Sequence, residues 1–153
     1  MAARDPQRAR VYAWEHEWCD WNRSTLTLRE ARAAVHWACD KYGIHPPAVK
    51  QHAGAAYSFS RGEPANVISF RYDQRNPAVA LHEAAHYICG VLFGEVTDMA
   101  DHSPEWMGVY LWLLEGYRVA PRTALYASAK AKGIRWVDTW VVSPKRLQRQ
   151  RRT

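Results

Sequence analysis

The sequence has little cysteine and no long apolar run. Its three cysteines, Cys19, Cys39 and Cys89, are scattered through 153 residues and none belongs to a CxxC pair. This number and spacing exclude a disulfide framework and a cysteine-rich zinc ribbon. No apolar stretch approaches the roughly 20 residues that a membrane span needs, and the first residues lack the apolar core of a secretory signal. We therefore expect a cytoplasmic protein that does not contact a membrane.

Acidic residues are missing from the end of the chain. The net charge is +6, and the last nine residues contain five bases and no acid, so the rest of the chain is nearly neutral; the bases are Lys145, Arg146, Arg149, Arg151 and Arg152. A basic tail suits DNA or an acidic partner, although a solvated terminus explains it equally well. We expect three segments: an N-terminal segment (1–24), a domain (25–142) and a basic tail (143–153).

Hydrophobic residues make up 48% of the chain, enough for a packed core. Caps and helical spacing predict four helices: one over 27–43, one from 76 to about 93, one from 103 and one over 121–133. Residues 48–60 and 65–72 fit strands joined by a turn at 61–64, and 134–142 fits a further strand. Residues 1–24 fit either a strand or a short helix. We predict an α+β fold in which a small antiparallel sheet packs with about four helices.

The segment His82-Glu83-Ala84-Ala85-His86 carries the clearest chemical signal. Residues four apart lie on one face of a helix, so both imidazoles can reach a single zinc ion. Glu83 is then placed to act as general base toward a water molecule that the metal activates. The segment predicts a zinc-dependent peptidase, whereas an amphipathic helix with two surface histidines is the simpler alternative.

A catalytic zinc ion usually takes three protein ligands. Downstream of His86 the sequence has one histidine, His102, which we predict as the third ligand; Glu105 is the alternative. Because Glu105 falls in the first turn of the predicted third helix, the helix dipole already accounts for an acid there. Asp98 and Asp101 could orient an imidazole, although surface acids explain them as well.

His82-Glu-Ala-Ala-His86, followed by His102-Ser-Pro-Glu-Trp106, resembles the SprT-like zinc metallopeptidases. The resemblance implies a zincin-like metal helix, His82, His86 and His102 as Zn²⁺ ligands, and Glu83 as the catalytic acid and base. Some members of that family act on proteins crosslinked to DNA. This chain has Ser103 where the family pattern has glycine, and it lacks a zinc ribbon, so only the tail at 145–152 could substitute for the ribbon as a DNA contact.

The predicted activity is hydrolysis of a protein or peptide substrate. We expect an extended substrate to add to a sheet edge, for which 65–72 is a candidate, although an ordinary core strand is equally plausible. Tyr87, Tyr110 and Tyr117 could stabilise the oxyanion, but each also fits apolar packing. The alternative function is a non-catalytic binding module, stabilised by zinc, that serves as a nucleic-acid or virion accessory.

A cluster of tryptophans near the N-terminus, Trp14, Trp18 and Trp21, could stack on nucleic-acid bases. Burial in a small core is the simpler interpretation.

If the tail binds nucleic acid, deletion of residues 145–153 should weaken DNA binding and flatten its dependence on salt, because fewer phosphates are neutralised. Titration of labelled DNA at several salt concentrations measures both quantities. An unchanged salt slope would exclude the tail as a DNA contact.

Overall fold

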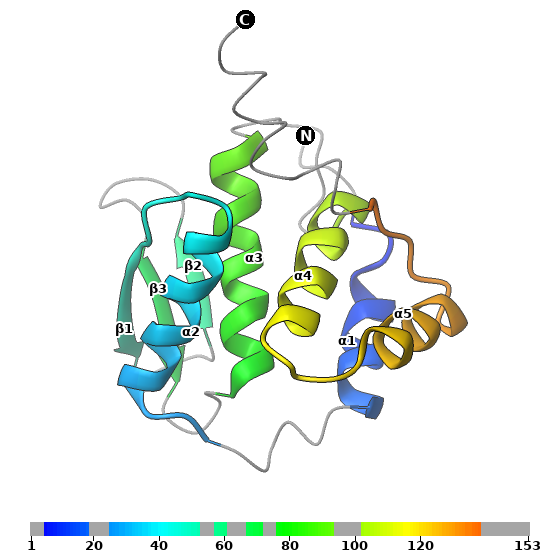
Figure 1. Cartoon of the computed structure of the whole chain (residues 1–153), viewed down its shortest axis with the longest axis horizontal. Coiled ribbons are helices and arrows are strands. Elements are labelled where there is room, and N and C mark those ends of the chain that lie inside the picture. The colour runs from blue at the N-terminus through cyan, green and yellow to red at the C-terminus, as the bar shows by residue number, and fades with distance from the viewer. Residues whose placement is uncertain are drawn as a thin grey trace, which may run out of the picture. The chain divides into compact units, whose positions relative to one another are not determined.

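The computed structural model describes residues 5–18, 25–52, 57–60, 67–71, 76–93 and 102–138. The chain divides into two compact units. Unit 2 is continuous and spans Asp20–Val91, whereas unit 1 combines Met1–Cys19 with Leu92–Thr153. The predicted α+β class is confirmed, with helices α1 to α5 and strands β1 to β3 within the described ranges (Figure 1).

Helix α2 (Leu28–Lys41) opens unit 2 on the predicted capping box. The Glu30 amide donates to the Thr27 hydroxyl at 3.1 Å, and the Thr27 amide donates to the Glu30 carboxylate at 2.7 Å. After the helix, Gly43 adopts a φ of 64°, a backbone conformation that glycine tolerates best. Five residues of α2 are buried at helical spacing: Ala31, Ala34, Val35, Ala38 and Cys39.

The sheet of unit 2 has three strands in the order β1–β3–β2. β2 (Tyr57–Ser60) pairs antiparallel with β3 (Val67–Arg71), while the predicted turn at 61–64 lies outside the described residues. β1 (Ala48–His52) pairs with β3 in parallel, with Ala48 opposite Val67. The antiparallel prediction is therefore wrong for β1, because 48–60 forms two strands that lie on opposite sides of β3. The candidate edge strand at 65–72 is wrong as well, since β3 lies in the middle of the sheet.

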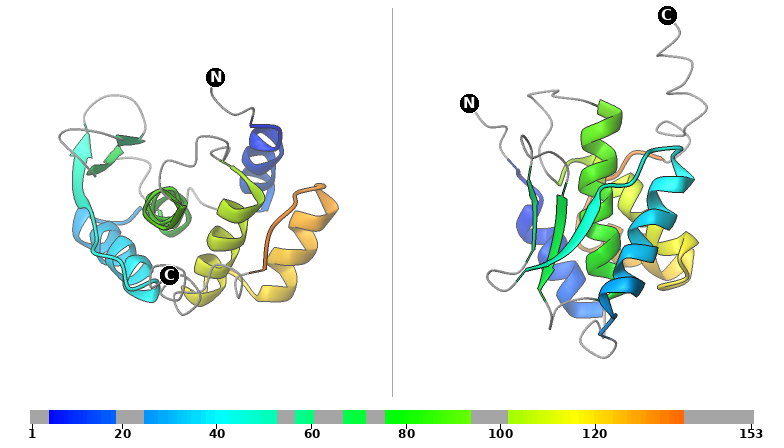
Figure 2. Two further views of the ribbon diagram at one scale, coloured as in Figure 1. Left: turned by 90° about the horizontal axis from the view of Figure 1, so that it is seen from above. Right: turned by 90° about the vertical axis from the view of Figure 1, so that its left-hand side faces the viewer.

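Helix α3 (Pro77–Phe93) follows the sheet and begins where the sequence predicts. The Asn76 side chain caps it by accepting a hydrogen bond from the Val79 amide at 2.9 Å. Its Tyr87 hydroxyl donates to the His45 carbonyl oxygen at 2.8 Å, which ties the helix to the loop before β1. Within unit 2, α2 and the strands lie beside α3 in both views of Figure 2.

Unit 1 contains α1 (Arg8–Trp18), α4 (Pro104–Gly116) and α5 (Arg122–Ala131). Ser103 caps α4 by accepting from the Trp106 amide, and Pro104 occupies its first turn, both as predicted. Trp14 of α1 is buried and donates through Nε1 to the Ser128 hydroxyl of α5 at 2.8 Å. Trp14 is thus a core residue rather than a stacking platform, while Trp21 lies outside the described residues.

Two expectations for unit 1 change. Part of the N-terminal segment forms α1, a helix that the sequence left undecided. Residues 134–138 form no strand; instead the Val137 amide donates to the Pro104 carbonyl at 2.9 Å, so this segment lies against the start of α4. The remainder of the predicted strand, 139–142, and the tail at 143–153 lie outside the described residues.

Within the part of the chain that the structure describes, no helix is both long and apolar enough to cross a membrane.

Gly108 marks a close approach within unit 1. A Cβ atom at this position of α4 would collide with the Val137 carbonyl oxygen. We expect Gly108→Ala to lower the free energy of unfolding by about 1–3 kcal/mol, because a main-chain atom must move. Gly116→Ala, at the exposed end of the same helix, is the matched control and should be neutral or stabilising. Urea denaturation measures both; equal stability of the two variants would contradict the close approach.

Cys39 offers a pH-dependent test of the α2 packing. Burial raises the pKa of its thiol from 9.0 to about 12. Above about pH 9 the unfolded chain loses this proton and the folded chain keeps it, so stability should fall until about pH 12. The slope from this thiol is about 1.4 kcal/mol per pH unit. Cys39→Ala should show a shallower decline in denaturation experiments across this range; an unchanged slope would contradict the shifted pKa.

Candidate metal centre

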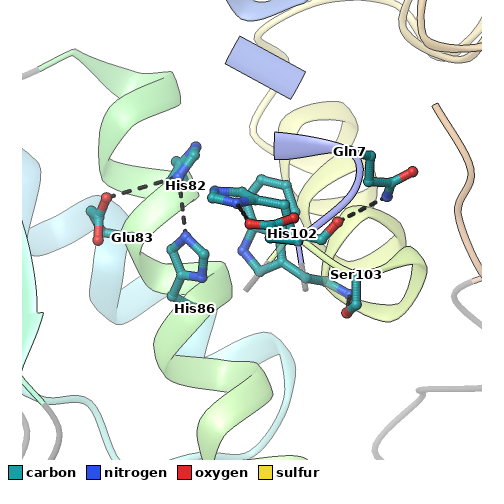
Figure 3. Close-up of polar contacts among 8 residues, drawn as sticks. Gln7, His82, Glu83, His86, His102 and Ser103 are labelled. Atoms are coloured by element: carbon teal, nitrogen blue, oxygen red, sulfur yellow. Dashed lines mark hydrogen bonds and ion pairs between the residues drawn. The ribbon is translucent and has the colours of Figure 1, made fainter. Parts of the chain in front are cut away.

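Helix α3 brings His82, Glu83 and His86 together in unit 2, as the sequence predicts (Figure 3). His82 and Glu83 are only 3% and 4% exposed, and His86 is half-buried. The helix is otherwise apolar, with alanines at 84 and 85 fully buried. The two imidazoles therefore leave the same side of a helix whose regular geometry fixes their spacing.

The two imidazoles meet through their Nε2 atoms, which lie 3.2 Å apart. Two nitrogens bound tetrahedrally to one zinc ion, at 2.0–2.1 Å each, stand about 3.3–3.4 Å apart. The observed distance fits that geometry closely. It also fits one N–H···N hydrogen bond between a donating and an accepting ring. His82 and His86 thus fit two positions of a metal site, with Nε2 as the ligand atom of each.

Glu83 lies next to this pair. Its Oε1 is 3.9 Å from His82 Nε2, and its side chain is 6% exposed. A carboxylate in such a place is expensive to bury unless a proton or a cation accompanies it. The arrangement puts a proton acceptor beside two potential metal ligands.

His102 lies in unit 1, at the start of α4, and is 4% exposed. Its Nδ1 is 2.7 Å from Asp5 Oδ2. Because a carboxylate oxygen accepts, Nδ1 is the donor in this contact, and in the neutral ring this tautomer places the lone pair on Nε2. The main chain of His102 is fixed too, since the Gln7 side chain donates to its carbonyl oxygen at 2.9 Å (Figure 3).

Aromatic rings flank His102 within unit 1. Trp106 meets the imidazole edge-to-face, with centroids 4.7 Å apart and planes at 82°. Tyr12 of α1 packs on it with centroids 5.3 Å apart and planes at 64°, and this residue is 38% exposed. These contacts hold the imidazole ring in one orientation.

The other candidates fall in different places. Glu105 lies in the first turn of α4, where the helix dipole favours an acid, and does not belong to the set of possible ligands among the described residues. Tyr87 is bound to the His45 carbonyl, and burial raises the pKa of its hydroxyl. Tyr110 is fully buried and packs on Trp106 at 4.9 Å.

The remaining sequence candidates include Tyr117, which caps the C-terminal end of α4. Asp98 and Asp101 lie outside the described residues, as does the basic tail.

Sequence reasoning missed Asp5 and Gln7. They stand 97 and 95 positions from His102, so no local pattern connects them to it. The sequence carried one indirect signal, since a histidine ligand commonly donates its second nitrogen to a carboxylate. That rule points to a carboxylate without saying which one.

Three histidines, His82, His86 and His102, each offer one ring nitrogen and could hold a metal ion. Comparisons with models of protein families, with curated proteins and with solved structures found no match to this chain. The chemistry of these side chains is therefore what the functional proposal rests on.

Proposed function

We propose that this protein is a zinc-dependent peptidase, with His82, His86 and His102 as the metal ligands and Glu83 as the general base. The observation that carries the proposal is the 3.2 Å separation of the two Nε2 atoms beside a buried carboxylate. A site that only stabilises the fold needs no proton acceptor next to its first ligand, whereas a hydrolytic site does.

The choice of zinc follows from the ligands. Imidazole nitrogens suit Zn²⁺, and three histidines are the protein ligands of one known class of catalytic zinc site. Three possible ligands, each with one ring nitrogen, support this set. A zinc ion held by these three histidines would supply Lewis-acid chemistry, acidifying a water molecule and polarising a carbonyl group.

Glu83 has two tasks in this proposal. Its carboxylate accepts a proton from the attacking water as the new C–O bond forms at the scissile carbonyl. It then delivers that proton to the amine nitrogen as the C–N bond breaks, so the reaction consumes one water and returns Glu83 to its starting state.

We propose a protein or peptide as substrate. An extended segment could add at β1 or β2, the two outer strands of the described sheet. The resemblance to the SprT-like pattern supports the same reaction. The one departure noted in the motif, Ser103 in place of glycine, is compatible with it because Ser103 caps α4. DNA contact through the tail at 145–152 remains a separate proposal that depends on its charge alone.

The decisive variant is Glu83→Gln, which keeps the size of the side chain and removes its basicity. We expect zinc binding to persist and cleavage to fall by about 10²–10⁴-fold, because the variant removes the carboxylate proposed to accept the proton. Glu105→Gln is the matched control and should cleave like the wild type. The assay follows self-cleavage and cleavage of an unfolded basic protein, with and without single-stranded DNA.

Cleavage that survives Glu83→Gln would contradict the assignment. A wild-type protein that binds zinc tightly and cleaves none of these substrates would favour the non-catalytic binding module. Stimulation by DNA would support a DNA-linked role for the peptidase.

A further inference from the structure

The N-terminal segment of unit 1 holds His102 through both its side chain and its main chain. Asp5 binds the imidazole Nδ1 at 2.7 Å, and Gln7 donates to the His102 carbonyl oxygen at 2.9 Å. Neither residue has a separate task in the chemistry proposed above. Their shared target is the residue proposed as the third metal ligand.

We propose that Asp5 is a positioning residue that prepares His102 to bind the metal, an inference that rests on the proposed role of His102 as a ligand. The carboxylate accepts the Nδ1 proton, which selects the tautomer whose Nε2 lone pair is available. It also makes the imidazole a better electron donor. The residue never touches the metal or the substrate and acts only through the ring of His102.

The geometry favours this role over capping of α1. The helix begins at Arg8, and the Val11 amide donates to the Gln7 carbonyl, so Asp5 stands two positions before the cap. Its Oδ1 is buried with no hydrogen-bond partner among the described residues. Burying a carboxylate in this way is unfavourable unless it is paired, and the Asp5–His102 contact supplies the pairing.

Gln7 supports the arrangement by fixing the surrounding main chain. Its side chain is 4% exposed and makes three hydrogen bonds. The amide nitrogen donates to the carbonyl oxygens of His102 and Arg135 at 2.9 and 3.0 Å, and the amide oxygen accepts from the Arg135 amide at 3.1 Å. Both N–H groups and the oxygen are thus used, and Gln7 joins the start of α1 to His102 through one bond and to Arg135 through two.

Ring contacts complete the constraint. Trp106 lies edge-to-face with the imidazole on one side and Tyr12 packs on it as well. With Nδ1 bound to Asp5 and the ring held between neighbours, Nε2 has a fixed direction before any metal arrives. A ligand prepared in this way loses less conformational entropy on binding.

The test compares zinc affinity in Asp5→Ala, Asp5→Asn and the wild type, by competition with a chromophoric chelator. We expect Asp5→Ala to weaken binding by about 10–100-fold. Asp5→Asn keeps an acceptor oxygen but loses the charge, so its affinity should fall between the two. Asp40→Asn, which removes an exposed charge in unit 2, is the matched control and should bind like the wild type.

A second measurement does not depend on variants. Long-range ¹H–¹⁵N spectra of the metal-free wild type should show His102 with its proton on Nδ1. A proton on Nε2 would overturn the proposal even if Asp5→Ala fails to fold. The variant experiment can overturn the proposal too: an Asp5→Ala protein that keeps the wild-type melting temperature without metal and binds zinc with wild-type affinity would contradict it.

The outcomes separate this inference from the proposed function. If Glu83 is required for cleavage and His102→Ala weakens zinc binding, while Asp5→Ala binds as tightly as the wild type, only the positioning role is wrong. If His102→Ala binds zinc like the wild type, the three-histidine site and the positioning role both fail. If zinc affinity depends on Asp5 but no substrate is cleaved, the positioning role stands and the peptidase does not.

Discussion

The Nε2 atoms of His82 and His86 lie 3.2 Å apart, and this separation depends on the regular geometry of α3. Such nitrogens approach closely only when a proton or a cation lies between them, since two facing lone pairs repel. Holding them there requires a regular helix over at least one full turn. Asn76 supplies its N-terminal cap, and Tyr87 anchors it to the loop at His45. The alanines at 84 and 85, between the two histidines, are fully buried.

In unit 1 the position of His102 is fixed by contacts between distant segments of the chain. Its centre is a buried amide side chain, Gln7, that joins the start of α1 to His102 and to Arg135. Further along, the Val137 amide binds the Pro104 carbonyl, and Gly108 allows the main chain to pass close to α4. Polar contacts at these crossing points are expensive to leave unmade inside a protein, so each one specifies a position as well as adding stability.

Local signals explain what the sequence predicts well. The capping box of Thr27 and Glu30, and Ser103 followed by Pro104, act within four residues, so the start of α2 and of α4 could be placed from the sequence. The spacing of His82 and His86 likewise needs only helical geometry. These predictions succeed because cause and effect lie on the same turn of helix.

The predictions that are wrong, and the residues that were missed, depend on contacts between residues far apart in the sequence. The parallel pairing of β1 with β3 depends on which side of β3 each strand reaches, which alternation of side chains does not encode. Residues 134–138 have the composition of a strand, yet the Val137 amide finds its acceptor at Pro104. Asp5 reaches His102 across 97 positions. Only the packed chain brings such partners together.

The discontinuity of unit 1 has a consequence for the order of events during synthesis. Unit 2 is one continuous stretch and can fold as soon as it leaves the ribosome, whereas α1 must wait for Leu92 and the residues after it. Asp5 and Gln7 are made well before their partners, since His102 lies 97 positions after Asp5 and Arg135 lies 128 positions after Gln7. The newborn chain therefore carries the His82–His86 pair before His102 is held in place. If the proposed site is correct, its ligand set stays incomplete in the nascent chain until the segment that contains His102 has been made.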